Sequence, residues 1–339
     1  MTYSWHKSEL DRLLARKERL PHALLLRGTQ GIGKLAFAEA LARALLCEKP
    51  APDGSACGRC ASCGWMGQGS HPDFRRLEPD SLLAERDDAE RGSEKKEKAS
   101  TQIPVEQARA LAGFINVSSH RGGSKVILIH PAEALNVSAA NALLKGLEEP
   151  PSRTYFLLVA HRWNQLLPTI RSRCQNLALP QPSTAEGRAW LKEQGLSDPE
   201  LALAQAGNAP LLALKFDEEY WSQRADFLKS VARPNFDALG VAERLRDVAP
   251  ALVVGWLQKW TFDIVSHKAT GALRYNPDFS AAVAAIAGRI DPIEAVRFQR
   301  HVVRLQRIVF HPLNARLFFE QLMLTYAALL GGRPLGLAA

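Results

Sequence analysis

The 339-residue sequence has no apolar stretch long enough to cross a membrane, since runs such as APALVVGWL fall far short of the roughly 20 residues required. Its first twenty residues, MTYSWHKSELDRLLARKERL, are too polar and charged for a secretory signal. We therefore expect a cytoplasmic protein. Cysteine is scarce, with five residues, and in that compartment we expect thiols or metal ligands rather than disulfides.

Common catalytic arrangements are also missing. The sequence has no HExxH metalloprotease motif, and the adjacent Ser118, Ser119 and His120 do not build a nucleophilic triad. Hydrophobic residues (46%) and charged residues (23%) occur at the frequencies of an ordinary soluble globular protein. A net charge of +8 gives weak support to a role in a nucleic-acid-handling assembly.

Short apolar runs alternate with helical patterns in the first half of the chain. This alternation predicts an α/β fold with a parallel sheet and helices on both faces. Strands are predicted at 22–27, 72–79, 125–130, 154–160 and 175–180, and helices at 33–46, 105–115 and 137–151. Only helical patterns follow, beginning with 184–195 and 198–207. The charge-rich segment 80–101 is predicted to be a solvated, mobile insertion.

The stretch GTQGIGK at 28–34 has the G-x-x-x-x-G-K order of a phosphate-binding loop and lies between a predicted strand and helix. Backbone N–H groups of such a loop and the helix N-terminus bind phosphate oxygens. Its candidate nucleotide-binding residues are Gly28, Gly31, Gly33 and Lys34.

The residues that would hold magnesium are absent. The loop lysine should be followed by Ser or Thr, but position 35 is Leu. The acidic residues expected at the end of the strand predicted at 125–130 are replaced by His130 and Pro131. Glu133, three residues further, is not expected to point in the same direction. We predict a degenerate ATPase site: ATP or ADP binding through Lys34 stays open, and magnesium-dependent hydrolysis is not expected.

Four of the five cysteines form a compact cluster with the spacing C-x9-C-x2-C-x2-C. Four thiolates around one ion predict a structural zinc site, because no coordination position stays open for catalysis. The predicted ligands are Cys47, Cys57, Cys60 and Cys63. Two alternatives remain, namely metal-free reduced cysteines, or His71 in place of Cys47. Cys174 is interpreted as a separate buried residue.

The motif NALLKGLEEPP at 141–151, followed by SRC at 172–174, resembles clamp-loader AAA+ subunits. Together with the loop and the cysteine cluster, the sequence is similar to the delta-prime subunits of the bacterial DNA polymerase III clamp loader. The resemblance covers residues from about 22 to 179 well and the helical remainder loosely. Motor subunits of that family carry a lid arginine where this sequence has Pro210.

This resemblance implies an AAA+ P-loop-type α/β domain at 1–179, a small helical lid at 180–215 and a helical collar domain at 216–339. It implies a zinc module at about 47–63 and a hetero-pentamer with gamma/tau and delta subunits. That complex loads the sliding clamp onto primed DNA, within a holoenzyme that has DNA-directed DNA polymerase activity. The implied role is a non-catalytic subunit that closes the ring.

Arg173, in SRC, matches the arginine that this family inserts into a neighbouring subunit's ATP site. The resemblance favours this arginine-finger role over a surface arginine in a salt bridge. Lys145 and Glu148 share one face of the predicted helix, as a local ion pair or as a contact to the adjacent subunit. Ser172, beside Arg173, is a further candidate for such a contact.

Four arginines also recur along one face of the predicted helix at 294–310, with Val296, Val303 and Leu305 expected mostly on other faces. They are Arg297, Arg300, Arg304 and Arg307. A solvated face is the favoured interpretation, and a contact with collar subunits or DNA phosphates is the alternative.

Two other functions compete with the non-catalytic subunit. One is a gamma/tau-like motor with residual ATPase activity, which predicts turnover by the isolated chain. The other is a nucleotide-binding regulatory module outside replication.

Overall fold

The computed structural model describes residues 2–84, 100–120, 123–233, 237–309, 314–333 and 335. The chain divides into two compact units, Met1–Pro182 and Ser183–Ala339. Most of the charged 80–101 segment lies outside the described residues.

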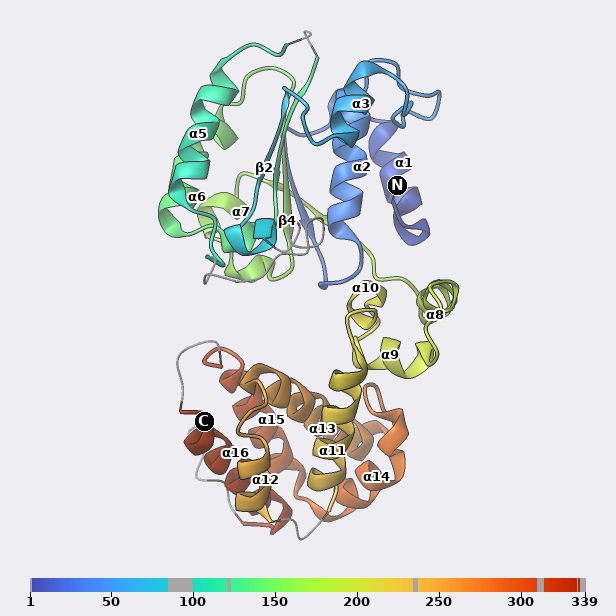
Figure 1. Ribbon diagram of the computed structural model, residues 1–339, viewed down its shortest axis with the longest axis vertical. Helices are drawn as coiled ribbons and strands as arrows, with labels where there is room; N and C mark the ends of the chain where they lie inside the picture. The colour runs from blue at the N-terminus through green and yellow to red at the C-terminus, as the bar shows by residue number, and fades with distance from the viewer. Residues whose placement is uncertain are drawn as a thin grey trace. The chain divides into compact units, whose positions relative to one another are not determined.

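The first unit contains a five-stranded parallel sheet with the strand order β2-β3-β4-β1-β5 (Figure 1). Its strands are β1 (Ala23–Arg27), β2 (Phe74–Leu77), β3 (Lys125–Ile129), β4 (Thr154–Ala160) and β5 (Gln175–Ala178). Leu24 of β1 lies opposite Leu157 of β4 on one side and Gln175 of β5 on the other. The central strands are continuously apolar because helices cover both faces of the sheet.

Helices α1, α2 and α3 lie on one side of this sheet and α5 and α6 on the other (Figure 1). The helical segments are η1 (Ser4–His6), α1 (Lys7–Leu14), η2 (Lys17–Arg19), α2 (Lys34–Leu46), α3 (Ala61–Gly67), α5 (Val105–Asn116), η3 (Ala132–Ala134), α6 (Val137–Glu148), η4 (Trp163–Gln165) and α7 (Pro168–Arg171). Alternate strand residues, including Leu25, Ile127 and Phe156, pack against Leu111 and Leu143 of α5 and α6. The sheet therefore fixes the loops at both of its ends.

The second unit is built from helices joined by loops, and its described residues include no strand. It comprises α8 (Thr184–Glu193), α9 (Pro199–Gln205), α10 (Pro210–Ala213), α11 (Glu218–Val231), α12 (Ala238–Arg244), α13 (Pro250–Thr270), η5 (Pro277–Phe279), α14 (Ser280–Arg289), α15 (Pro292–Leu305) and α16 (Ala315–Leu330). Trp260 donates a hydrogen bond of 2.7 Å to the Tyr326 hydroxyl, which donates to the carbonyl of Val231 at 3.1 Å. Among the described helices, none has the length and apolar content needed to span a membrane.

The predicted fold class, a parallel α/β domain followed by helices, is confirmed. The boundary between the two units lies close to the predicted end of the α/β domain at 179. The short helices α8 to α10 belong to the same compact unit as α11 to α16. Within it, Gln205 of α9 donates to Tyr275 and Asn276, and accepts from Tyr220 of α11. A separate lid domain at 180–215 stays a prediction.

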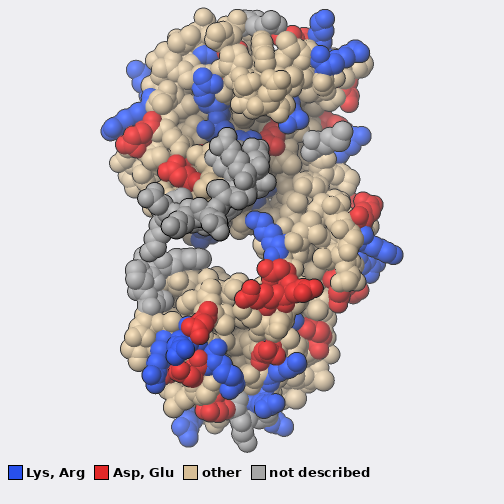
Figure 2. All heavy atoms as spheres, viewed as in Figure 1, with Lys and Arg blue, Asp and Glu red and all other residues tan. Residues whose placement is uncertain are grey.

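The sequence interpretation of α15 needs one correction. Val296 and Val303 are 44% and 41% exposed, so they share the solvent-facing side with the arginines. The reason is helical geometry, since positions 296, 300 and 303 follow each other by four and three residues. The helix predicted at 294–310 ends at Leu305, so Arg307 lies in the turn that follows α15. Arg297 pairs with Glu294 in the preceding turn. On the face shown in Figure 2, basic and acidic side chains are interspersed over the coloured residues of each unit rather than separated by sign.

Candidate functional site

The glycine-rich segment joins β1 directly to α2, as the sequence predicts. Gly31 and Gly33 have φ values of 81° and 95°, a left-handed conformation that glycine adopts without steric cost. The turn brings the N-terminus of α2 to the carboxyl end of β1, an interior strand between β4 and β5. This arrangement of strand, loop and helix is the one that binds phosphate groups in P-loop proteins.

Lys34, however, is engaged by the loop itself. Its Nζ donates to the carbonyl oxygens of Gly28 at 2.7 Å and Thr29 at 2.6 Å, and the residue is only 2% exposed. Burial lowers the pKa of the ammonium to about 8, while the nearby charge of Glu133 acts in the opposite direction. A phosphate that used Lys34 would first have to displace these two carbonyl contacts.

The N-terminal segment packs against the same loop. The ring of Tyr3 lies so close to Gly33 that a Cβ there would stand 2.3 Å from Tyr3 Cδ2. Tyr3 stacks on Trp5 with ring centroids 4.8 Å apart, and the Trp5 indole donates to the carbonyl of Ile32 at 2.9 Å. The sequence reasoning missed these two residues, whose signal was a pair of aromatic residues in an otherwise polar N-terminal stretch.

The positions that would coordinate magnesium contain groups unsuited to it. Leu35 supplies no oxygen, and His130 follows the last residue of β3 with its ring 5.3 Å from that of His161. Glu133 accepts hydrogen bonds from the backbone N–H groups of His161 and Arg162 at 2.9–3.1 Å. Its carboxylate therefore caps the end of β4, although its charge reaches Lys34.

Arg173 lies just after α7, in an ion pair with Glu148 at the end of α6. Its Nε donates to Glu148 Oε1 at 2.6 Å, and a second guanidinium nitrogen contacts the same oxygen. The remaining nitrogen donates to the carbonyl of Thr169 at 2.8 Å and lies 3.4 Å from the hydroxyl of Ser172. The two motifs NALLKGLEEPP and SRC are thus joined by this contact.

The other residues predicted at this surface behave differently. Among the described residues no ion pair joins Lys145 to Glu148, and Glu148 pairs with Arg173. Lys145 is exposed and lines a small pocket of about 200 Å³ between α5 and α6. Ser172 is exposed and donates to the carbonyl of Thr169 at 3.1 Å.

The cysteine cluster has the geometry of a metal centre. The four sulfur atoms lie within 4.8 Å of one another, with pairs at 3.7, 3.9 and 4.0 Å. A tetrahedron with metal–sulfur bonds of about 2.3 Å has edges of about 3.8 Å, so these separations suit one ion. Backbone N–H groups of Cys57 and Cys63 point at the sulfurs of Cys47 and Cys60. The four cysteines can therefore hold a metal ion.

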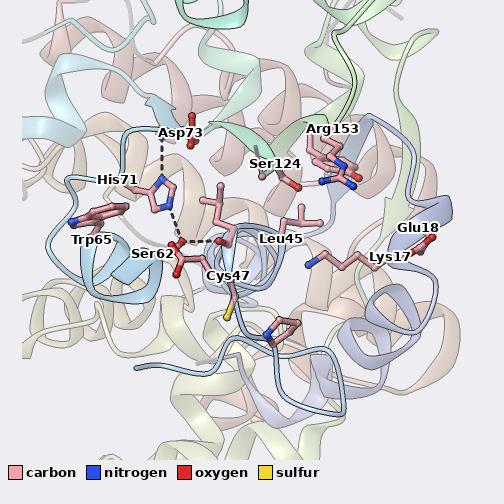
Figure 3. Close-up of a pocket in the computed structure, with 15 residues that line it drawn as sticks. Lys17, Glu18, Leu45, Cys47, Ser62, Trp65, His71, Asp73, Ser124 and Arg153 are labelled. Carbon is pink, nitrogen blue, oxygen red and sulfur yellow. Dashed lines mark hydrogen bonds between the residues drawn. The ribbon is translucent and has the colours of Figure 1, made fainter. Parts of the chain in front are cut away.

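His71 is placed beside this module but uses both ring nitrogens elsewhere. The Ser62 hydroxyl donates to the carbonyl of Leu46 at 2.6 Å, so it must accept from Nε2 of His71 at 2.8 Å. Nδ1 accepts from the backbone N–H of Asp73 at 3.0 Å. Figure 3 shows the imidazole between these partners, beside a cavity of about 670 Å³. Burial lowers the pKa of His71 and favours this neutral form.

The fold and the glycine-rich loop define a P-loop-type α/β protein. In this protein the loop lysine donates to carbonyl groups of the loop itself. A separate cluster of four cysteines can hold a metal ion. A family model described as "DNA polymerase III, delta subunit" matches residues 6–183. A curated DNA polymerase III subunit delta' of Pseudomonas aeruginosa is 38% identical over 79% of this chain and 78% of its own length. The subunit delta' of Escherichia coli K12 is 29% identical over 95% and 94%.

The chain belongs to the family of DNA polymerase III delta-prime subunits. Among solved structures, a DNA polymerase III gamma subunit-related protein of Thermotoga maritima aligns over 95% of this chain and 99% of its own. That alignment has 18% identity and a TM-score of 0.43.

Proposed function

We propose that this chain is a non-catalytic subunit that closes the ring of a clamp-loader hetero-pentamer with gamma/tau and delta subunits. In that complex it donates Arg173 to the ATP site of a neighbouring subunit and helps load the sliding clamp onto primed DNA. The names of the relatives, subunits delta' of DNA polymerase III, support this assignment.

The main support for a subunit without ATPase activity is that Lys34 donates hydrogen bonds to carbonyl groups of its own loop. Its ammonium is satisfied by the carbonyls of Gly28 and Thr29, in a site where Leu35 and His130 replace magnesium ligands. Without magnesium, the charge that develops during phosphoryl transfer is not neutralised. The loop then serves to connect β1 to α2, and hydrolysis takes place in the neighbouring subunit.

Arg173 has the chemistry that this neighbour requires. A guanidinium presents several N–H donors in one plane and stabilises negative charge on a transferring phosphoryl group. The side chain of Arg173 is 32% exposed and lies just after α7, so a subunit docked at this surface can reach it. An arginine supplied in trans contributes about 10³ to 10⁵ in rate in GTPase systems.

In this proposal the four-cysteine cluster stabilises the fold and takes no part in catalysis. We propose zinc as the ion, because four thiolates with no open position are typical of structural zinc sites. Bound there, the ion would link the end of α2 to α3 through Cys47 and Cys60.

The test is reconstitution of the complete clamp loader with Arg173→Ala. We expect DNA-dependent ATP turnover to fall at least tenfold while the complex still assembles, because the guanidinium acts in the transition state. Arg173→Lys, which keeps the charge but loses the planar fork, should restore only part of the turnover. Arg171→Ala is a matched control, because Arg171 lies two residues before Arg173 and its guanidinium stands over the ring of Trp163.

Unchanged turnover and clamp loading in Arg173→Ala would refute the arginine-finger role. Magnesium-dependent ATP turnover by the isolated chain would instead support the gamma/tau-like motor as its function.

A further inference from the structure

The guanidinium of Arg173 has no nitrogen left without a partner in this structure. Nε and one terminal nitrogen donate to Glu148, and the other terminal nitrogen donates to the carbonyl of Thr169. A phosphate in a neighbouring subunit needs the same donors. Glu148 and that phosphate therefore compete for Arg173.

The Arg173–Glu148 ion pair lies at the surface, where its attraction is weak. The side chains of Arg173 and Glu148 are 32% and 47% exposed, so water screens their attraction. An exposed pair of this kind is weak enough to break when a triphosphate offers more negative charge. The two residues also lie 25 positions apart, on segments that follow different strands, so a shift between α6 and α7 would change their separation.

We propose that Glu148 is the resting partner of Arg173, a positioning residue that restrains the guanidinium until an assembled neighbour presents its nucleotide. This inference rests on the proposed arginine-finger role. In the resting complex Glu148 keeps Arg173 from the neighbouring phosphates and so limits ATP turnover before DNA binds. When DNA brings the subunits into their active arrangement, the phosphates displace Glu148.

The experiment is reconstitution of the full clamp loader with Glu148→Gln. ATP turnover without DNA should rise about two- to fivefold, the range that corresponds to an exposed ion pair. Turnover with primed DNA and clamp should change little, so the factor by which DNA stimulates turnover should fall. A residue with only a structural role would lower both rates together, which makes the ratio the decisive readout.

Three variants make the result specific. Glu149→Gln removes the same charge one residue away, where the described residues show no contact with Arg173, and should leave the ratio unchanged. Glu148→Asp keeps the carboxylate and should retain most of the restraint. Arg173→Ala combined with Glu148→Gln should match Arg173→Ala alone, because Glu148 acts only through Arg173.

The outcomes separate the two proposals. If Arg173→Ala lowers turnover but Glu148→Gln does not raise the rate without DNA, the resting-partner role is wrong and the finger role stands. If Arg173→Ala leaves turnover unchanged, the finger role fails and the resting-partner role fails with it. A double variant that retains the increase of Glu148→Gln would also overturn the inference.

Discussion

The Nζ of Lys34 lies 2.6 Å from the carbonyl oxygen of Thr29, in the loop that would otherwise surround a phosphate. The same Nζ donates to the carbonyl oxygen of Gly28 at 2.7 Å, so the loop itself supplies both partners of the ammonium. Tyr3 covers Gly33 at the N-terminus of α2, where a phosphate oxygen would meet backbone N–H groups. Nucleotide binding therefore competes with contacts that the chain already makes.

This competition predicts weak nucleotide binding without a magnesium effect. The isolated chain should bind ATP weakly, and added magnesium should not tighten binding, because Leu35, His130 and Pro131 supply no carboxylate or hydroxyl. Titration calorimetry with and without magnesium measures both quantities. A gain of tenfold or more in affinity on adding magnesium would contradict the degenerate site.

The lowered pKa of Lys34 predicts a pH dependence of stability. Folding shifts this pKa from 10.5 to about 8, so between these values the unfolded chain binds more protons than the folded chain. The free energy of unfolding should then rise with pH across this window, by at most about 1.4 kcal/mol per unit for one group. This contribution is lost as the pH falls through about 8.

Lys34→Met removes that titration and tests its source. Urea unfolding of wild type and variant across the window should show a smaller slope of stability against pH in the variant. Lys259, whose pKa burial also lowers to about 8, remains in both proteins and cancels in the comparison. Equal slopes would mean that Lys34 does not titrate in this range.

Most helices and strands of the first unit were predictable because their sequence signals are local. Continuous apolar runs indicated β3 and β4, and the prediction of 154–160 for β4 matches Thr154–Ala160. The helix predicted at 137–151 ends earlier, at Glu148, since the residue before a proline is disfavoured in the helical conformation. Apolar patterns and proline positions therefore predicted most of the helices and strands of the first unit.

The contacts of the candidate residues join distant positions and left no local signal in the sequence. Spacing on α6 left two interpretations of Glu148, a local pair with Lys145 or a contact to an adjacent subunit, whereas the fold pairs it with Arg173, 25 residues away. Likewise, Tyr3 and Gly33 meet because η1 packs beside the start of α2, which no periodic pattern encodes. Sequence identified Arg173 and Lys34 as candidates, but their partners required the three-dimensional structure.

His71 is expected to stabilise the first unit without binding the metal. Replacing it with Ala removes the partners of the Ser62 hydroxyl and the Asp73 N–H, both in a buried region. This should lower the free energy of unfolding by about 1–3 kcal/mol. Metal analysis of the purified variant should still give one zinc per chain, and loss of the zinc would instead make His71 a ligand.

The cysteine cluster predicts one zinc ion per chain, with four equivalent contributions to its retention. Cys60→Ser replaces a thiolate by a weaker ligand, so purified variant protein should contain well under one zinc per chain and unfold at a lower temperature. Cys174→Ser is the matched control, because this cysteine is buried outside the cluster and burial raises its pKa to about 12. Its zinc content should equal that of wild type. Wild-type protein with far less than one zinc per chain after purification without chelators would rule out the proposed site, and equal zinc in Cys60→Ser would exclude Cys60 as a ligand.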